Sequence, residues 1–306
     1  MMSTLSKKVI DGLKAKGWAG GIVPIGRLSE LERDVGSLLD QGLVDKAVHE
    51  AYLMEFKYQV PEQLPDARSI IVVAVPQPKM RVHFTFDGKD RATIVPPTYA
   101  NAWTVIDGVK ATLEGITAAE GGRFERARLP LKTLAARTGL VRYGRNNITY
   151  LPDHGSYHRL VAYYSDLDFE VDHWQEREPL PACKTCDLCR KACPASVISQ
   201  DRFLIHVERC LTFLNEMPSD RPFPEQVRAD WHNAIVGCMR CQEACPYDKK
   251  MRDWTEEGGR FSEQETRYLL KGDFSEASAK AMNEKLERCG LDLTVFPRNL
   301  VALLGL

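Results

Sequence analysis

The sequence lacks both a long apolar run and a strong charge of one sign. No apolar stretch approaches the roughly 20 residues that a membrane-spanning helix needs. The first residues show neither a twin arginine nor a secretory apolar segment. A net charge of −1 over 306 residues gives no basis for bulk attraction to nucleic acid or to a membrane surface. We therefore expect an ordinary globular protein in the cytoplasm, with no membrane contact.

Several common cofactor motifs are also missing. The chain contains no Gly-x-Gly-x-x-Gly and no Walker sequence, so neither a Rossmann nucleotide site nor ATP hydrolysis is supported. Its seven histidines are scattered, and no His-x-x-His pair occurs among them. Any cofactor chemistry must therefore be sought in other residue types.

Cysteine, by contrast, is concentrated in one part of the chain. The first four of these cysteines read Cys-x2-Cys-x2-Cys-x3-Cys-Pro, the run of bacterial ferredoxins. The second group repeats the Cys-x2-Cys-x3-Cys-Pro ending, with its leading cysteine displaced upstream. Eight of the nine cysteines form this pattern: Cys183, Cys186, Cys189, Cys193, Cys210, Cys238, Cys241 and Cys245.

This spacing predicts two [4Fe–4S] clusters with exchanged ligands. A cubane needs four thiolates at tetrahedral corners, and one tight loop supplies three of them. In two-cluster ferredoxins the fourth cysteine of each run ligates the other cluster. The same logic gives one cluster the ligands Cys183, Cys186, Cys189 and Cys245. The other cluster would have the ligands Cys210, Cys238, Cys241 and Cys193. Because such clusters transfer single electrons, we expect a redox-active protein.

Two other uses of cysteine fit the pattern less well. Disulfides are disfavoured because the chain is long and has no secretory signal. Zinc sites use paired Cys-x2-Cys units, but not a third cysteine at the same spacing and a fourth followed by proline, twice. Cys289 lies outside the pattern and is expected to be a buried small hydrophobe.

Hydrophobic periodicity predicts an α+β or α/β domain before the cysteines. Helices are expected over 5–16, 28–40, 43–56, 99–118 and 131–138. Strands are expected over 21–25, 69–75 and 159–164, with a hairpin over 81–95 that places Gly88 at positive φ. A short helical tail is expected to follow the cysteines, with helices over 262–271, 275–289 and 297–304. We therefore expect a first domain over 1–178, with a linker near 171–182, a ferredoxin-like module over 179–250 and the tail over 251–306.

The residues before the cysteines are more numerous than an electron carrier needs, which points to a cofactor or substrate site. Glycines and small polar residues are dense between residues 139 and 166. Glycine lets backbone amides approach a ligand closely, and asparagine and serine offer neutral donors and acceptors. A ligand site is one interpretation of this segment. A turn held by its own asparagine side chains is the alternative.

The order of these segments resembles the epoxyqueuosine reductase family, which is related to corrinoid-dependent reductive dehalogenases. The shared features are a Gly-Leu-x-x-x-Gly-[Lys/Arg]-Asn segment, a Gly-Ser segment, a Ser/Thr-Asp-Leu segment and the cysteine pattern. The resemblance implies a nitroreductase-like α/β domain that carries base-off cobalamin beside two [4Fe–4S] clusters. It would place Gly139, Gly144, Arg145, Asn146, Asn147, Gly155 and Ser156 around the corrinoid, with Asp166 and Leu167 closing the strand end beneath it.

The resemblance also bears on the proton donor. Glu125 stands where the family has a proton-donating aspartate, and a glutamate would serve as a general acid. A solvated glutamate paired with a nearby arginine is the alternative. Tyr143 is the second candidate donor, with packing as its alternative role.

Two further features concern partners. The helical-repeat extension that the family uses for tRNA is largely missing, which makes tRNA a less favoured partner. Residues 121–145 hold six Arg and one Lys against a single Glu. This stretch would meet a phosphate or an acidic partner, or it is a solvated basic face.

Three functions remain open from the sequence. The main hypothesis is a corrinoid-dependent reductase in which an external ferredoxin or flavodoxin reduces the clusters and a cobalt centre reduces a small electrophilic substrate. The second is an electron-transfer or activation protein that reduces a partner's corrinoid. The third is epoxyqueuosine reduction on tRNA itself.

Overall fold

A computed structural model describes residues 3–272, 282, 285–287 and 295–306. Cys289 and most of the helix expected over 275–289 lie outside the described residues. The chain forms two compact units, residues 1–76 with 105–186 and residues 77–104 with 187–306. This division differs from the three consecutive domains expected above, because residues 77–104 pack with the C-terminal part of the chain. The three domains stay a prediction.

The first unit is built on a four-stranded sheet in the order β1-β2-β8-β5. Its strands are antiparallel and comprise β1 Ala19–Pro24, β2 Ser69–Pro76, β5 Phe124–Arg126 and β8 His158–Ser165. Strand β2 pairs with β8 over its whole length, and all of its residues except Pro76 are buried. The expectation of a strand covered on both faces is thus confirmed. Sequence reasoning did not anticipate the short edge strand β5.

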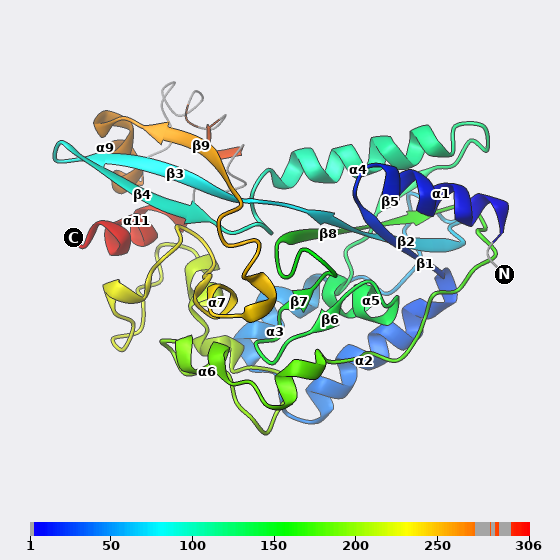
Figure 1. The fold of residues 1–306 in the computed structure, drawn as a ribbon, viewed down its shortest axis with the longest axis horizontal. Helices are drawn as coiled ribbons and strands as arrows, with labels where there is room; N and C mark the ends of the chain where they lie inside the picture. The colour runs from blue at the N-terminus through cyan, green and yellow to red at the C-terminus, as the bar shows by residue number, and fades with distance from the viewer. Residues whose placement is uncertain (1–2, 273–281, 283–284, 288–294) are drawn as a thin grey trace. The chain divides into compact units, whose positions relative to one another are not determined.

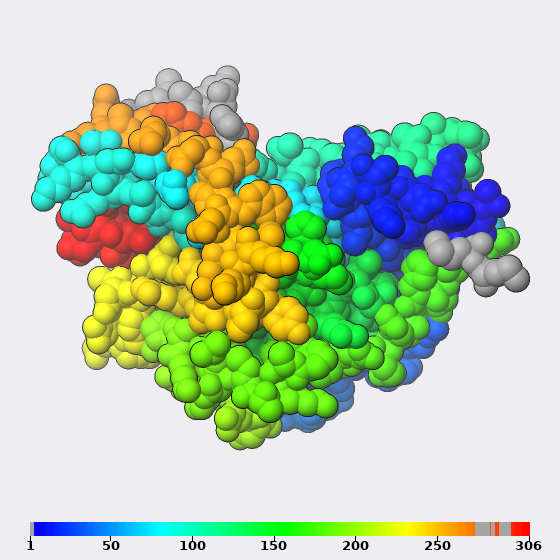
Figure 2. Space-filling model, viewed as in Figure 1, coloured from blue at the N-terminus to red at the C-terminus, as the bar shows by residue number. Residues whose placement is uncertain are grey.

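Helices cover both faces of this sheet (Figure 1). On one face, Ile71 and Val73 of β2 share a core with α1 (Thr4–Ala15) and α4 (Ala102–Ile116). On the other, Ile70 and Val72 share a core with α2 (Leu28–Asp40) and α5 (Leu131–Arg137). The two cores are separate because successive side chains of a strand point to opposite faces. Figure 2 shows the outward face of α1, in blue, at the surface.

Shorter elements complete the first unit. Helix α3 (Lys46–Tyr52) continues into a 3-10 turn at Leu53–Glu55, close to the helix expected over 43–56. Two very short strands, β6 (Arg142–Tyr143) and β7 (Thr149–Tyr150), pair as an antiparallel hairpin. This hairpin contains the first half of the glycine-dense segment. The unit ends in a 3-10 turn at Pro181–Lys184.

The second unit has a three-stranded sheet in the order β4-β3-β9. Strands β3 (Lys79–Phe86) and β4 (Lys89–Val95) form the expected hairpin, with Asp87 and Gly88 both at positive φ in its turn. Strand β9 (Thr255–Phe261) pairs parallel to β3. The short helical tail expected over 251–306 thus also contains a strand that the sequence did not indicate. The polar run in β9 gives no alternating signal, and long-range pairing with β3 makes it a strand.

Helices and aromatic packing close this sheet. Helix α9 (Glu263–Lys271) begins at a capping box formed by Ser262 and Glu265, and α11 (Phe296–Leu304) lies near the expected helix over 297–304. The rings of Phe84 and Phe261 stack with centroids 4.9 Å apart. The mixed α/β character expected from the sequence is confirmed in both units.

The cysteine segment consists of short helices and turns, as expected. Its α-helices are α6 (Leu188–Ala192), α7 (Leu211–Glu216) and α8 (Arg240–Glu243). Its 3-10 turns are Val207–Arg209, Ala229–Trp231 and Pro246–Asp248. None of the helices in the described part of the chain combines the length and the apolar character that crossing a membrane would require.

Candidate iron–sulfur site

The two Cys-x3-Cys-Pro endings have the same local structure in the second unit. Cys189 lies on α6 and Cys241 lies on α8, and these two helices contact each other. Cys193 and Cys245 follow the helices in extended conformation, with φ of −77° and −76°. The repeat seen in the sequence is therefore a repeat in space.

Matching backbone hydrogen bonds hold the two copies. The Cys193 N–H donates to the carbonyl of Arg190, and the Cys245 N–H donates to that of Gln242. Three residues later, the N–H groups of Ser196 and Asp248 donate to the carbonyls of Cys193 and Cys245, in both cases at 3.1 Å. Each proline follows a cysteine whose extended backbone suits the residue before proline. Local chain geometry thus presents the thiols in the same way twice.

Cys210 and Cys238 belong to the same neighbourhood. Cys210 stands directly before α7, after a 3-10 turn. Burial raises the pKa of the Cys210 thiol, and it raises that of Cys238 to about 12. Cys193 adds an electrostatic contribution of the same sign to both. Buried thiols ionise readily only beside a metal or another positive charge, which is the environment that an iron cluster provides.

Cys183 and Cys186 end the first unit. The Cys183 N–H donates to Leu180 O at 3.0 Å, and the Cys186 N–H donates to Ala182 O at 3.2 Å. The carbonyls of both cysteines accept hydrogen bonds from the Arg145 guanidinium, which reaches Cys186 O through Nε at 3.2 Å and Cys183 O through Nη2. The loop that carries this pair of cysteines is therefore held by a side chain from the hairpin.

The donor set fits iron–sulfur clusters better than a single ion. None of the eight cysteines of the pattern is in a disulfide. Within the described ranges, no three His, Cys, Asp or Glu side chains gather as ligands of one metal ion. A [4Fe–4S] cubane is larger than a single metal ion, and each of its four irons binds its own thiolate. Two short helices that present thiols at ferredoxin spacing fit that requirement. The assignment of individual cysteines to clusters stays a prediction.

The hairpin expected to line a corrinoid is filled by its own side chains. Asn146 is buried, and its amide donates to the Tyr150 hydroxyl at 2.9 Å while its Oδ1 accepts from Ile148 N–H at 3.4 Å. A Cβ on Gly144 would lie 2.6 Å from Asn146 Oδ1 and 2.6 Å from the Tyr150 ring. Asn147 adopts a φ of 59°, the left-handed region that asparagine tolerates. These contacts match the alternative interpretation, a turn held by its own asparagines.

The remaining residues of the expected corrinoid pocket also have internal roles. Gly139 ends α5 with a φ of 73°, and the Gln175 side chain occupies the place where its Cβ would be. Ser156 is buried. His158 Nδ1 lies 3.1 Å from Gly155 O, and its Nε2 lies 3.1 Å from Thr149 Oγ1. Because a carbonyl only accepts, Nδ1 carries the proton. Their places around a corrinoid stay predictions.

Asp166 is tied to the sheet edge. Its carboxylate accepts from the Arg123 backbone N–H at 2.9 Å and from the Arg123 Nε at 2.7 Å. Burial alone would raise the pKa of Asp166, but these two hydrogen bonds outweigh it and lower the pKa. The side chain of Leu167 lies against Gly122, where a Cβ would meet it at 2.4 Å. Both residues lie at the end of β8 and make contacts within the protein, and their place beneath a corrinoid stays a prediction.

The two proton-donor candidates differ in their surroundings. Glu125 is half-buried in the edge strand β5, opposite Tyr164 of β8. Tyr143 is buried in the apolar core, with its hydroxyl 3.3 Å from Thr133 Oγ1. Burial raises the pKa of Tyr143 to about 12. Their roles as proton donors stay predictions.

Three of the seven cations in the basic stretch over 121–145 form ion pairs within the first unit. Arg123 binds Asp66 and Asp166. Arg137 binds Asp34 at 2.7 Å and Glu176 at 3.1 Å, and Arg142 binds Glu178 at 2.6 Å. Such pairing leaves less positive charge for a phosphate than the sequence suggests. Sequence reasoning missed it because most of the acids lie elsewhere in the chain.

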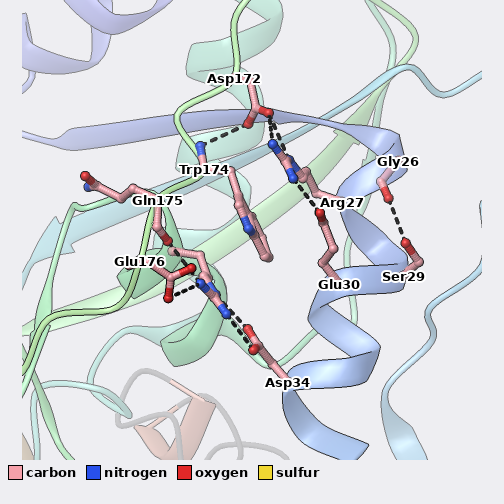
Figure 3. A network of polar contacts seen from close by, with 10 residues as sticks. Gly26, Arg27, Ser29, Glu30, Asp34, Asp172, Trp174, Gln175 and Glu176 are labelled. Carbon is pink, nitrogen blue, oxygen red and sulfur yellow. Dashed lines mark hydrogen bonds and ion pairs between the residues drawn. The ribbon is translucent and has the colours of Figure 1, made fainter.

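Sequence reasoning also missed how the expected linker is held (Figure 3). The Trp174 ring lies between two guanidiniums, that of Arg27 at 5.4 Å and that of Arg137 at 5.2 Å from its centroid. Arg27 also binds Asp172 at 2.5 Å, and Trp174 N–H donates to Asp172 Oδ1 at 2.9 Å. We call residues 172–176 the strap. It is bound along the first unit, so this part of the expected linker is fixed.

A hollow of about 310 Å³ lies beside the start of the strap. It is lined by Pro24, Arg68, Ser69, Asp168, Phe169, Glu170, Val171 and Asp172. None of the residues expected around a corrinoid lines it. Asp168 accepts from the Glu170 N–H at 3.0 Å, and Asp172 is bound to Arg27. Two of its three carboxylates thus hold the chain itself.

Comparison with known proteins places these features in context. Residues 182–248 match the family model described as a 4Fe-4S double cluster binding domain. Over 169 residues the chain is 27% identical to an epoxyqueuosine reductase of Cyclobacterium marinum, covering 54% of this chain and 52% of the relative. The chain spans about half the length, or less, of the curated relatives it matches.

Solved structures extend the likeness to nearly the whole fold. The epoxyqueuosine reductase of Streptococcus thermophilus superposes with a TM-score of 0.68 at 20% identity, covering 99% of this chain and 81% of that one. An epoxyqueuosine reductase with an epoxyqueuosine-modified tRNA-Tyr stem loop superposes with a TM-score of 0.67 at 19% identity, covering 98% of this chain and 80% of that one. The expected resemblance is confirmed: the chain is similar to epoxyqueuosine reductases in sequence, has their fold, and contains a double [4Fe–4S] cluster-binding domain.

Proposed function

We propose that this chain is an iron–sulfur oxidoreductase that reduces the epoxide of epoxyqueuosine in tRNA. The observation that carries the proposal is the spatial repeat of the cysteine helices α6 and α8, within a fold shared with epoxyqueuosine reductases. The sequence alone ranked tRNA low because the helical-repeat extension is largely missing. The likeness to a relative with a modified tRNA stem loop supports the opposite ranking.

The electron count suits this reaction. Removing an epoxide oxygen as water takes two electrons and two protons and leaves a carbon–carbon double bond. Each [4Fe–4S] cluster carries one electron, so two reduced clusters hold both electrons. An external ferredoxin or flavodoxin would supply these electrons one at a time. In this proposal each cluster has four of the cysteines of the pattern as ligands, paired as the ferredoxin spacing predicts.

The two protons need donors, and the proposal assigns this role to Glu125 first. Glu125 stands at the aspartate position of the family pattern and is partly accessible on β5. Tyr143 is the second candidate. With its pKa raised to about 12, it keeps its proton at neutral pH, and its burial limits its access to a substrate. In E125Q we expect slower turnover with both clusters still reducible, whereas Y143F should mainly affect stability.

The corrinoid is the finer part of the proposal, and it rests on the sequence resemblance. When bound, cobalamin supplies a strongly reducing, nucleophilic cobalt centre. The residues expected around it are engaged in the hairpin's own contacts, so no step is assigned to it here. The test is a titration of the cluster-containing protein with cob(II)alamin. Stoichiometric binding would establish the corrinoid, and a protein with intact clusters that ignores it would remove this part.

The proposed reaction is tested with a tRNA stem loop that carries epoxyqueuosine. The reduced protein should convert it to a product with one oxygen atom fewer by mass spectrometry. C238S, which removes a predicted cluster ligand, is the matched control and should give no product. If both clusters are reducible and the stem loop is not converted, the proposal fails. Reduction of a small electrophile, or of a partner's corrinoid, would then be tested with the same protein.

A further inference from the structure

The hairpin between Tyr143 and Tyr150 is joined to the loop that carries Cys183 and Cys186 at several points. The Leu180 N–H donates to Tyr143 O at 2.8 Å, and Tyr143 forms a parallel β-bridge with Pro179. Beyond these backbone contacts, one side chain of the hairpin reaches the cysteines themselves. That side chain is Arg145, whose two hydrogen bonds end on the carbonyls of Cys183 and Cys186.

Hydrogen bonds within the first unit hold the turn that carries Arg145. The turn that carries it is held by the Gly144 N–H, which donates to Ile148 O at 2.8 Å, and by the Lys132 ammonium, which donates to Asn147 O at 3.1 Å. The buried Asn146 side chain adds its bonds to Tyr150 and Ile148. A rigid turn therefore presents a planar guanidinium to two carbonyls three residues apart, a geometry that suits the forked donors of arginine and not the single ammonium of lysine.

Arg145 also forms no ion pair with a carboxylate of the described residues. Its side chain is half-buried. Its neighbour Arg142 is exposed and bound to Glu178. A half-buried cation beside two cluster ligands is stabilised by the negative charge of a thiolate-ligated cluster, and this attraction grows when the cluster gains an electron.

We propose that Arg145 is a positioning residue for the cluster ligated by Cys183 and Cys186, and that its charge raises the reduction potential of that cluster. The hairpin is then a brace for a cluster loop. This inference rests on the clusters of the proposed function and not on its substrate.

The test is a redox titration of the purified, cluster-containing protein, followed by electron paramagnetic resonance without substrate. In R145Q one cluster should become harder to reduce by about tenfold in its equilibrium constant, or about 59 mV for a one-electron couple. The other cluster should not shift. The control R142Q removes the same charge from the same hairpin, and both of its potentials should stay at the wild-type values.

A second variant separates charge from geometry. R145K keeps the positive charge but cannot bridge both carbonyls, so its potentials should stay near wild type while one cluster loses iron to a chelator several-fold faster. Loss of a single cluster in R145Q, seen as half the wild-type iron content, would also support the positioning role.

Three results would overturn the inference. The first is two intact clusters in R145Q with unchanged potentials and unchanged iron loss. The second is an equal shift in R142Q. The third is a wild-type protein without iron, which would remove the proposed function as well. A stem loop that is not converted by a protein showing the R145Q shift would remove only the proposed function.

Discussion

The two parts of the cysteine segment are held in different ways. In the repeat formed by residues 187–196 and 239–248, the backbone hydrogen-bond partners of Cys193 and Cys245 lie three residues away. In the loop of Cys183 and Cys186, the side-chain support comes from Arg145, 38 and 41 residues upstream. The repeat is therefore organised by its own chain, whereas the loop depends on the first unit for part of its geometry.

This difference separates two kinds of change. A substitution in the first unit that loosens the hairpin should affect the loop of Cys183 and Cys186 and leave the repeat intact. A substitution in the repeat should act directly on thiol ligands. Four predictions test this separation, beginning with the ligands themselves.

Loss of a ligand should have the largest effect. The exchanged pairing predicts that C245S and C186S remove the same cluster, although Cys245 and Cys186 lie in different halves of the pattern. C193S and C238S should remove the other cluster. Each variant should hold about four irons per chain instead of about eight. The cluster that remains in C245S and C186S should give a different electron paramagnetic resonance spectrum from the one that remains in C193S and C238S. If C245S and C241S instead remove the same cluster, each half binds its own cluster and the exchange is wrong.

The same contrast explains what could be predicted from the sequence. Some features depend only on residues close together in the chain and can be predicted from the sequence. They are the cysteine spacing, the proline after each run and the short helices between the cysteines. The strand over 69–75 and the helix over 28–40 were equally readable, because their apolar patterns are strong and continuous. The turn at Gly88 followed from its residue types.

Long-range contacts explain what was missed. Strand β9 becomes a strand only through pairing with β3, more than 170 residues earlier. The strap was interpreted as a linker because nothing near Trp174 reveals that Arg27 and Arg137 enclose it. The resemblance places Arg145 beside a corrinoid, whereas its hydrogen-bond partners in the structure lie on a segment that no local pattern connects with it.

The second prediction concerns the pH dependence of stability that is due to His158, whose side chain contacts Thr149 of the hairpin. Burial lowers the pKa of His158 from 6.5 to about 4. The unfolded chain therefore takes up a proton near pH 6.5, and the folded chain does so only near pH 4. The contribution of His158 to stability should be unchanged above pH 6.5 and should fall by about 3 kcal/mol as the pH drops to 4.

Two matched variants, one in each unit, show which histidine causes this loss of stability. His232 of the second unit has the same lowered pKa, mainly through burial. The thermal midpoints of H158Q and H232Q, each compared with wild type at pH 7 and pH 5, should both show a smaller loss on acidification. Only H158Q should also speed iron release from one cluster at pH 7. Equal release in the two variants would contradict the separation of the two regions.

The third prediction loosens the turn directly. N146A removes a buried partner from Ile148 N–H and the Tyr150 hydroxyl, which should cost about 2 kcal/mol. Y150F removes only the hydroxyl and should cost less. In N146A, iron release should accelerate for the cluster that Cys183 and Cys186 ligate. Release at the same rate from both clusters would mean that the hairpin does not support one loop selectively.

The smallest effect is expected from the strap. W174L removes the aromatic face between Arg27 and Arg137 while leaving their carboxylate partners in place. Two partly exposed cation–π contacts of this kind contribute about 1–2 kcal/mol together, and W174F should retain part of that. The strap leads into the loop of Cys183 but makes none of the hydrogen bonds to its cysteines. W174L should therefore lower the thermal midpoint of the protein and leave both cluster potentials unchanged. A shifted potential would mean that the support of the loop extends from the hairpin through the strap to α2.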